Sequence, residues 1–596
     1  MATEEKTDAV RVEDTDTSAD RASPHHREVH VKTIQEEAAE QASPLDLGWR
    51  TWLVVFLSSF TIMAQVYTTV AAASVVAFIA MDFEVSSLSG WIIQGPLLMQ
   101  AALSPIVGRL SDILDRKYLA SIPPLIAFVG AVVCAKATSM NMLIGGSILV
   151  GVTLSTIAIV QSIPSEILPL KYRAVANGIA FLGGASAGII GQLSAGAYSH
   201  LNSGGWRYIF WTQAAFHLTS AIGFLAFYWP PRHSDFPRMK VKEYIWACDP
   251  IGSFLFIGSS ALILLALDWA AGTYPWSDAH VIAPLVIGCV LLIVFGVYEW
   301  KARPDGLVAH VFFRSGPNFP LSVFAFAVEG WIFYSAVNAI TPQMILRLGW
   351  EADPWRIAVR QLSYLLPIFF FSIPITWYAT RFRDLRSPLL LCFAVFLATA
   401  IAYACVRPSW NAAQQGLNVL SALGQSGPLT LLVAAVQFTA PHAYLSTATG
   451  LAFSARAVGG AVGSAVLDAI VAARLGSKYT SSVTAAARDA GLAEGAVEAL
   501  VQAMAGGAGV TSVDGLMAVV PGVRVEEVRS VVSAGYRVWA GAYRVAWASI
   551  VPFVVVACGC VAFLRGVREL MTERVEATVE RTAGDRGGEG KGSTEV

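Results

Sequence analysis

About fourteen apolar stretches, each long enough to cross a lipid bilayer, follow one another along this chain of 596 residues. A transmembrane helix needs roughly 20 mostly apolar residues. Inside the hydrocarbon core the backbone satisfies its own hydrogen bonds only as a helix or a closed barrel, so stretches of this length indicate helices. The stretches are 52–80, 88–108, 118–136, 141–164, 174–199, 208–228, 250–268, 281–300, 318–340, 357–379, 388–406, 416–438, 447–473 and 543–566. We therefore predict an all-α membrane protein.

The composition supports this class and argues against several others. Hydrophobic residues make up 55% of the chain and charged residues 14%, whereas about a quarter of the residues in a soluble domain carry charge. The net charge is -1, and the basic residues form short clusters between apolar runs, which gives no electrostatic support for a nucleic-acid partner. The seven cysteines lie in or beside apolar segments without CxxC spacing, so we expect no disulfide framework, no metal site and no other cofactor.

Lysine and arginine are unevenly shared between successive loops, and this predicts the orientation. Loops rich in basic residues follow the second, fourth, sixth, eighth and tenth stretches, whereas the loops after the first, third, fifth and seventh stretches carry one basic residue or none. Short cytoplasmic loops hold the excess of lysine and arginine in membrane proteins. We therefore place both termini in the cytoplasm.

The chain also repeats itself after a shift of 272 residues. Arg109 to Ile113 falls on Arg381 to Leu385, and Gly178 to Phe181 falls on Gly450 to Phe453. Parallel repeats with a substrate site between the halves are one of the main plans of membrane transporters. The predicted parts are a disordered cytoplasmic tail at 1–47, a six-helix bundle at 48–230, linkers with two inserted helices at 231–316, a second six-helix bundle at 317–566, and a disordered cytoplasmic tail at 567–596. Within the second bundle, residues 474–538 are predicted to form a long outer loop with amphipathic helices.

Several motifs resemble one known family. Gly108-Arg109-Leu110-Ser111-Asp112 with Arg116-Lys117 resembles the loop between helices two and three of the major facilitator superfamily. Together with Glu166 to Arg173, Gly205 to Phe210 and Arg456 to Gly463, it looks like the fungal trichothecene efflux pump family, which neighbours the fungal siderophore transporters. The resemblance covers about residues 48–566 and implies the major facilitator fold and proton-coupled transport of a small organic substrate.

The resemblance implies a conformational switch in the repeated loop, where an aspartate accepts hydrogen bonds from a helix N-terminus or an arginine across the interface between the halves. The candidate residues are Gly108, Arg109, Asp112, Arg116, Lys117, Arg381 and Asp384. The alternative is a basic cytoplasmic loop without a switching role. The chain departs from the family pattern at Asp115, where glycine is usual, at Ser147 in the fourth stretch, where many relatives have arginine, and at Ile189, where proline usually follows Gly188.

Few ionisable residues lie inside the apolar stretches, and each costs about 2.5–3.5 kcal/mol at the bilayer centre, so each suggests a function. Glu329 is our candidate proton carrier, and Arg456 could pair with it or bind an anionic group of the substrate. His217 could titrate near physiological pH. The alternatives are a carboxyl group bonded to a neighbouring helix, a fixed ion pair and a packing histidine.

Two further groups of residues complete the predicted machinery. Six glycines allow close helix packing, namely Gly184, Gly188, Gly191, Gly459, Gly460 and Gly463. Amide and aromatic side chains would line a cleft for a bulky, mostly neutral ligand, namely Gln65, Tyr67, Gln161, Trp331, Tyr334, Asn338 and Gln425. The alternative for the aromatic residues is a belt at the membrane surface.

We interpret the chain as a monomeric, proton-coupled exporter of a toxin, drug or secondary metabolite, and family resemblance favours the plasma membrane. Siderophore uptake and a receptor that transports nothing are the alternatives. The stretches contain no histidine pair, HExxH motif or paired aspartates that would suggest a membrane enzyme.

Overall fold

A computed structural model provides the structure of the protein. It describes residues 47–83, 90–114, 116–201, 204–230, 240–270, 274–314, 316–351, 354–505, 516–517, 523–573 and 575. Asp115 and most of the two predicted tails lie outside these residues. Everything below concerns the compact unit Lys32–Val596. Its described part contains 14 helical segments long and apolar enough to cross a membrane, which confirms the number predicted from the sequence.

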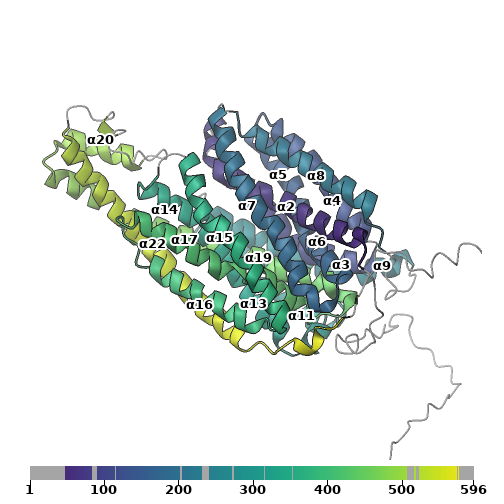
Figure 1. The fold of residues 1–596 in the computed structure, drawn as a ribbon. Coiled ribbons are helices and arrows are strands. Elements are labelled where there is room, and N and C mark those ends of the chain that lie inside the picture. Colours follow the sequence, from purple (N-terminus) through teal and green to yellow (C-terminus); the bar gives the residue numbers. More distant parts are fainter. Residues whose placement is uncertain are drawn as a thin grey trace, which may run out of the picture. The chain divides into compact units, whose positions relative to one another are not determined.

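The first bundle is built from the segments before residue 230. Its elements are α2 (Trp49–Asp82), α3 (Trp91–Ile113), α4 (Arg116–Ala135), α5 (Met140–Ser155), α6 (Ile157–Ile167), η1 (Leu170–Tyr172), α7 (Arg173–Leu201) and α8 (Arg207–Phe227). Helix α2 packs along α7 and α8, and α4 packs between α5 and α8 (Figure 1). The α2–α7 contact is close because a Cβ on Gly183 would meet the backbone oxygen of Ser59.

The second bundle follows residue 310. Its elements are α12 (Val311–Arg314), α13 (Asn318–Gly330), η2 (Trp331–Ile340), α14 (Thr341–Arg347), α15 (Pro354–Phe382), α16 (Arg386–Tyr403), α17 (Asn411–Ser426), α18 (Pro428–Gln437), η3 (His442–Tyr444), α19 (Leu445–Asp489) and α22 (Val525–Ala562), with η4 (Arg568–Leu570) after it. The segment η2 is a π-helix that continues α13 without a break. Such segments are rare and are often found at functional sites.

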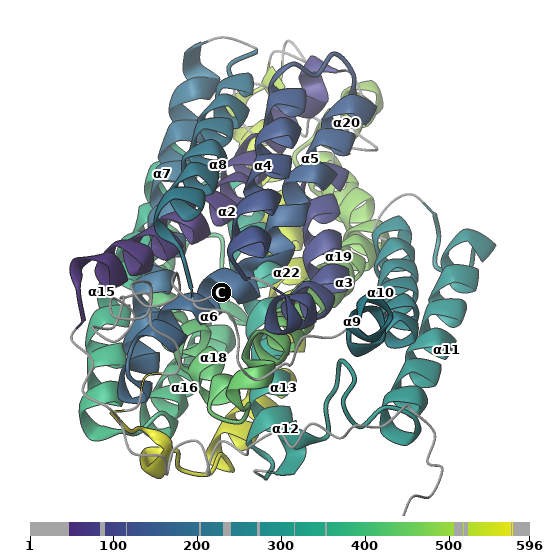
Figure 2. The same cartoon turned by 90° about the vertical axis from the view of Figure 1, so that its right-hand side faces the viewer.

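Two inserted helices, α10 (Pro250–Ala270) and α11 (Ala279–Lys301), lie between the bundles in sequence and follow the short helix α9 (Val241–Ala247). Figure 2 shows α10 and α11 side by side at the edge, and α10 also packs against α3 and α19. The chain thus consists of two six-helix bundles with two inserted helices, as predicted.

Helices α19 and α22 extend beyond the membrane-spanning part. The sequence predicts that the thirteenth span ends near residue 473, but α19 continues as one helix to Asp489. Tyr479, Val483 and Ala487 follow one another at intervals of four residues and therefore share one face. They form a small hydrophobic core with α20 (Glu494–Ala505) and the start of α22, which explains why the helix does not end at the membrane surface.

The two bundles meet mainly where α3 packs against α19 and where α7 packs against α15. We call the end of the molecule at which α3 ends and α19 begins the loop face; α9 lies there and α20 lies at the other end (Figure 1). A Cβ on Gly108 would clash with the backbone of Ser446, and one on Gly450 would clash with the backbone of Ser104. Small residues therefore allow α3 and α19 to approach closely.

Candidate functional site

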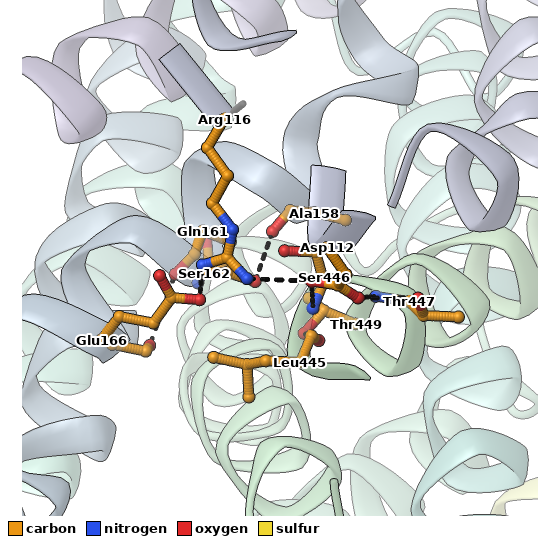
Figure 3. A network of polar contacts seen from close by, with 11 residues as sticks. Asp112, Arg116, Ala158, Gln161, Ser162, Glu166, Leu445, Ser446, Thr447 and Thr449 are labelled. Carbon is orange, nitrogen blue, oxygen red and sulfur yellow. Dashed lines mark hydrogen bonds and ion pairs between the residues drawn. The ribbon is translucent and has the colours of Figure 1, made fainter. Parts of the chain in front are cut away.

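Asp112 connects the two bundles at the loop face. Its side chain is 0% exposed and lies at the end of α3, where it faces the first turn of α19 (Figure 3). The carboxylate accepts hydrogen bonds from the backbone N–H groups of Ser446 (3.1 Å) and Thr447 (2.8 Å) and from the Thr447 hydroxyl (2.7 Å). A negative charge at a helix N-terminus is favourable because the first N–H groups lack partners within the helix.

Arg116 holds this aspartate from its own bundle. Its Nη2 atom donates to Asp112 Oδ1 at 2.9 Å, and its Nη1 atom forms an ion pair with Glu166 on α6. Figure 3 shows the guanidinium between the two carboxylates. All three side chains are at most 2% exposed, so their charges are balanced inside the protein rather than by water.

Arg109 and Lys117, which the sequence assigns to the same switch, point elsewhere. Arg109 donates to the backbone oxygens of Ala247 (3.1 Å) and Asp305 (3.0 Å), and its guanidinium lies over the Tyr444 ring. Lys117 lies over the ring of Trp229. Arg109 therefore connects α3 to the segments that flank the inserted helices.

A second polar contact joins the bundles at the loop face. Asn177 on α7 donates to the side-chain oxygen of Gln437 at 2.8 Å, and Arg173 donates to the Gln437 backbone oxygen at 2.8 Å. Gln161 donates to Asn177 at 2.8 Å. Gln161 is one of the predicted cleft residues; in the structure it supports this contact between the bundles.

The second copy of the repeated loop is built differently from the first. Asp384 is only half-buried, and it accepts from the backbone N–H groups of Arg386 (2.9 Å) and Ser387 (3.3 Å), which begin its own helix α16. Arg381 is exposed, and Arg383 has a positive φ of 54°. The turn between α15 and α16 therefore directs Asp384 onto α16, whereas Asp112 faces the other bundle.

Glu329 and Arg456 form a buried ion pair inside the second bundle, as the sequence suggested. Arg456 on α19 donates from Nε to Glu329 Oε2 at 2.5 Å and from Nη2 to Oε1 at 3.2 Å. The two residues are 2% and 4% exposed. Gly330 and Gly459 allow this because a Cβ on either would clash with the backbone of the opposite helix. Such a two-point contact gives the strongest geometry for an arginine–carboxylate pair.

The pair is linked to the first bundle through Tyr334 in the π-helix η2. Arg456 Nη1 donates to the Tyr334 hydroxyl at 2.8 Å, and that hydroxyl donates to Gln100 on α3 at 3.4 Å. A chain of polar contacts thus runs from Glu329 across the interface between the bundles. Arg456 is the residue that links the Glu329 carboxylate to Tyr334 in this chain of contacts.

The other predicted polar residues lie within single bundles. His217 is 0% exposed and contacts Gln213 at 2.9 Å on the same helix. Gln65 donates to Thr153 and Thr156, and Tyr67 bonds to Ser194 in the core of the first bundle. In the second bundle, Asn338 donates to the Phe333 backbone, Gln425 accepts from Tyr364, and Trp331 lies against Phe553. Their roles in proton or substrate binding remain predictions.

Four of the six predicted packing glycines lie at close helix contacts, whereas a Cβ on Gly184 or Gly191 would make only ordinary contact with its neighbours. Gly188 faces Leu365 on α15, so it brings the two bundles together, whereas Gly184 and Gly191 face α2. Gly460 and Gly463 face Tyr334 and Trp331, and Gly459 faces Ala327. Equivalent positions of the repeat, such as Gly188 and Gly460, therefore serve different contacts.

The sequence analysis missed the partners of the switch. Ser446 and Thr447 carry a signal in retrospect, because polar residues at a helix start leave N–H groups free to bind a carboxylate. Asn177 and Gln437 carry none, since single amides in apolar segments are common. The small cavity beside α10, lined by Trp91, Gln94, Asp268 and Asp468 among others, holds about 30 Å³, which is far smaller than a site for a bulky ligand.

The known proteins to which this chain is similar are named as transporters or efflux pumps. The family model described as Major Facilitator Superfamily matches residues 51–464. The "MFS-type transporter prx5" of Penicillium rubens is 30% identical over 364 residues, which are 60% of this chain and 65% of prx5. "Efflux pump FUS6" of Gibberella fujikuroi is 30% identical over 275 residues, 44% of this chain and 47% of the pump. "Efflux pump dotC" of Dothistroma septosporum is 28% identical over 287 residues, 48% of each chain. The chain thus matches just under two thirds of prx5 and about half of the two pumps.

Solved structures support the same fold. The proton:xylose symporter XylE bound to 6-bromo-6-deoxy-D-glucose has a TM-score of 0.51 and 12% identity, with coverage of 88% of this chain and 98% of XylE. A bacterial homologue of the human lysosomal transporter Spinster, in an inward-facing and unoccupied conformation, has a TM-score of 0.50 and 17% identity, with coverage of 89% and 99%. At these identities the likeness concerns the fold alone.

Proposed function

Because this chain belongs to the Major Facilitator Superfamily, we propose that it is a secondary active transporter that exports a small organic molecule in exchange for protons. The observation that carries the proposal is the contact of Asp112 with Ser446 and Thr447. It joins the bundles through hydrogen bonds at a helix end, which can break and form again as rigid bundles rock. Apolar packing alone would give no such discrete pair of states.

The loop face would be the cytoplasmic face, because the basic loops and both termini belong there by the positive-inside rule. With Asp112 and Gln437 in their contacts, the bundles are held together at this face. This arrangement would be the state closed toward the cytoplasm. Release of these contacts would open the cytoplasmic side and admit a substrate from inside the cell. The membrane we propose for the protein is the plasma membrane.

Glu329 would be the proton site. In the structure its carboxylate is held by Arg456, which also binds Tyr334. A proton arriving at Glu329 would cancel the charge that holds Arg456, and the freed guanidinium would weaken the link through Tyr334 to Gln100. Proton binding and bundle movement would thus be coupled through one arginine. His217 would then be a packing residue.

Relatives named efflux pumps favour export over import. The substrate class we propose is a bulky, mostly neutral toxin, drug or secondary metabolite, which would be held by aromatic and amide side chains such as Trp331 and Asn338 when the bundles separate. Siderophore uptake would use the same fold in the opposite direction. A receptor that transports nothing would show no flux at all.

A growth screen tests this proposal. Yeast cells deprived of their own drug pumps would express the protein or its Asp112→Asn variant and grow on a panel of inhibitors and fungal metabolites. An exporter gives resistance to a few compounds, and the variant, present at the same level in the membrane, gives less. Increased sensitivity would indicate uptake, and no effect on any compound would contradict the proposal.

A further inference from the structure

Two buried carboxyl groups face each other at the loop-face end of the inserted helices. Asp249 lies between α9 and α10, and Glu299 lies in the last turn of α11. Their side chains are 0% and 4% exposed. Neither residue belongs to the proposed switch or to the proposed proton site at Glu329.

One oxygen of each group already has donors. Asp249 Oδ1 accepts from the Gly252 N–H (3.1 Å) and the Tyr298 hydroxyl (3.3 Å), and Glu299 Oε2 accepts from the Val308 N–H (2.9 Å). The other oxygens, Asp249 Oδ2 and Glu299 Oε1, are buried and have no donor among the described residues.

These two oxygens are close to each other. A Cβ added to Gly252 would lie no farther than 2.6 Å from both of them, so the oxygens converge on a single point. A Cβ on Gly306 would also clash with the Glu299 carboxyl group. A side chain at position 252 or 306 would therefore displace the carboxyl groups, and the chain has glycine at both positions.

Charged and titratable groups surround the pair without neutralising it. Arg303 directs its guanidinium to the Trp246 backbone oxygen (3.0 Å) and to the Asp305 carboxylate (3.2 Å). Within the described part of the chain, neither Asp249 nor Glu299 forms an ion pair. The neighbouring groups that can carry charge are Arg109 on α3, Cys248 before α10, Tyr298 on α11, and Arg303, Asp305 and His310 after α11.

Two deprotonated carboxylates in this position would leave two neighbouring buried oxygens with no donor and with like charge. Such an arrangement is strongly unfavourable in a water-poor site. A single proton removes both problems, because the protonated group donates the missing hydrogen bond to the other. Paired carboxyl groups that share one proton behave in this way.

Each member of the pair also adjoins one of the two backbone groups that hold Arg109. Arg109 donates to Ala247, two residues before Asp249, and to Asp305, directly before Gly306. We propose that Asp249 and Glu299 form a proton-binding site whose shared proton keeps these two segments together around Arg109. When the proton leaves, the segments separate and the end of α3, which also carries Asp112, is held less firmly.

The test uses the purified full-length protein in detergent micelles and measures its melting temperature as the pH is raised from about 4.3, where an ordinary glutamate loses its proton. The folded protein keeps a proton on this pair that the unfolded chain releases, so the pair contributes a fall in the melting temperature as pH rises. In Glu299→Gln the amide replaces the protonated carboxyl group and donates the same bond. The contribution of the pair, on the order of a few degrees, should therefore be absent from Glu299→Gln, whose melting temperature should fall less with pH than that of the native protein. Glu243→Gln on exposed α9 should keep the native slope.

A second variant guards against a misfolded Glu299→Gln protein. Asp249→Asn should also fold and lose the contribution of the pair to the slope, because asparagine accepts the positive φ of 50° at this position and its oxygen still caps Gly252. If both single variants kept the native slope, or if neither folded, the shared proton would be refuted. Neither outcome depends on whether the protein exports a substrate.

A labelling experiment tests the connection to Arg109. In a chain whose only cysteine is Cys248, which is half-buried beside the pair, the rate of maleimide labelling is compared between the native pair and Glu299→Gln at each pH. The ratio of the two rates cancels the intrinsic pH dependence of the thiol. The ratio should rise with pH as the segments separate, and a constant ratio would contradict the proposed opening.

Discussion

Replacing Asp112 with asparagine should open the loop face. The carboxylate accepts three hydrogen bonds from α19 in the other bundle and one from Arg116 in its own. Asparagine has almost the same shape, but it has no charge, and its NH2 group faces donors instead of accepting from them. The change therefore removes the favourable charge at the N-terminus of α19 while leaving the packing of Gly108 against Ser446 in place.

The size of the effect follows from these contacts. A hydrogen bond to a charged group contributes about 1.5–3 kcal/mol, and a charge at a helix N-terminus contributes up to about 2 kcal/mol when it is partly buried. Allowing the asparagine oxygen to keep one bond, we expect the closed state to lose about 3 kcal/mol, which is roughly a 100-fold change in the ratio of closed to open molecules. A state closed in about 99 molecules of 100 would become about equally open and closed.

Pulsed electron paramagnetic resonance can measure this change. Spin labels would be placed on cysteines at Leu114 after α3 and at Phe382 at the end of α15, which are 41% and 54% exposed, in a chain without its seven native cysteines. We expect one short distance in the unaltered protein and a second, longer distance of similar weight in Asp112→Asn. The matched control is Asp384→Asn, because this aspartate caps only its own helix. An unchanged distance distribution in folded Asp112→Asn would refute the role of Asp112 in closing this face.

Three further predictions follow from the same contacts. Glu329→Gln should fold and reach the membrane but lose flux driven by a pH gradient in proteoliposomes. The control is Glu494→Gln on the exposed part of α20. Normal pH-dependent flux in Glu329→Gln would remove Glu329 from the mechanism. Gly108→Ala should destabilise the protein by about 1–3 kcal/mol, seen as a lower melting temperature, because the new Cβ meets the Ser446 backbone. In the control Gly145→Ala the new Cβ meets nothing within 4 Å, so this change should be neutral or stabilising. Equal effects of the two changes would contradict the close α3–α19 contact. Arg116→Ala should lower the free energy of unfolding by about 3–5 kcal/mol, because it leaves Asp112 and Glu166 buried without their partner. Lys171→Ala should lower it by at most about 1 kcal/mol, because the pair of Lys171 with Glu573 is exposed. Thermal unfolding of the two variants tests this order.

The fold could be predicted from the sequence because membrane insertion imposes a length and a composition on every spanning helix. The duplicated loop and glycine motifs then indicated two bundles. Amphipathic helices were expected after residue 473, but the unbroken continuation of α19 was missed because Arg474, Lys478 and Arg488 indicate the end of an apolar span. Its apolar face becomes clear only when Tyr479, Val483 and Ala487 are seen to pack on α20 and α22.

The site could be predicted only in part. The pairing of Glu329 with Arg456 followed from the cost of an unpaired charge in the membrane, which leaves few solutions for two such residues. The repeat suggested that Asp384 would behave like Asp112, but the turn at Arg383 has a different backbone conformation and redirects it. Polar residues such as Gln65 and Tyr67 could not be assigned to a cleft or to a bundle core from the sequence, because both environments place amides and hydroxyls inside apolar helices.

The most direct test of proton-driven export measures a compound identified by the growth screen in its fluorescent or radiolabelled form. Its accumulation would be followed in cells that express the protein, with the proton gradient intact and then collapsed by an uncoupler. We predict lower internal accumulation than in cells without the protein while the gradient is present, and no difference after it is collapsed. Higher accumulation with the protein, or export that persists without the gradient, would contradict the account.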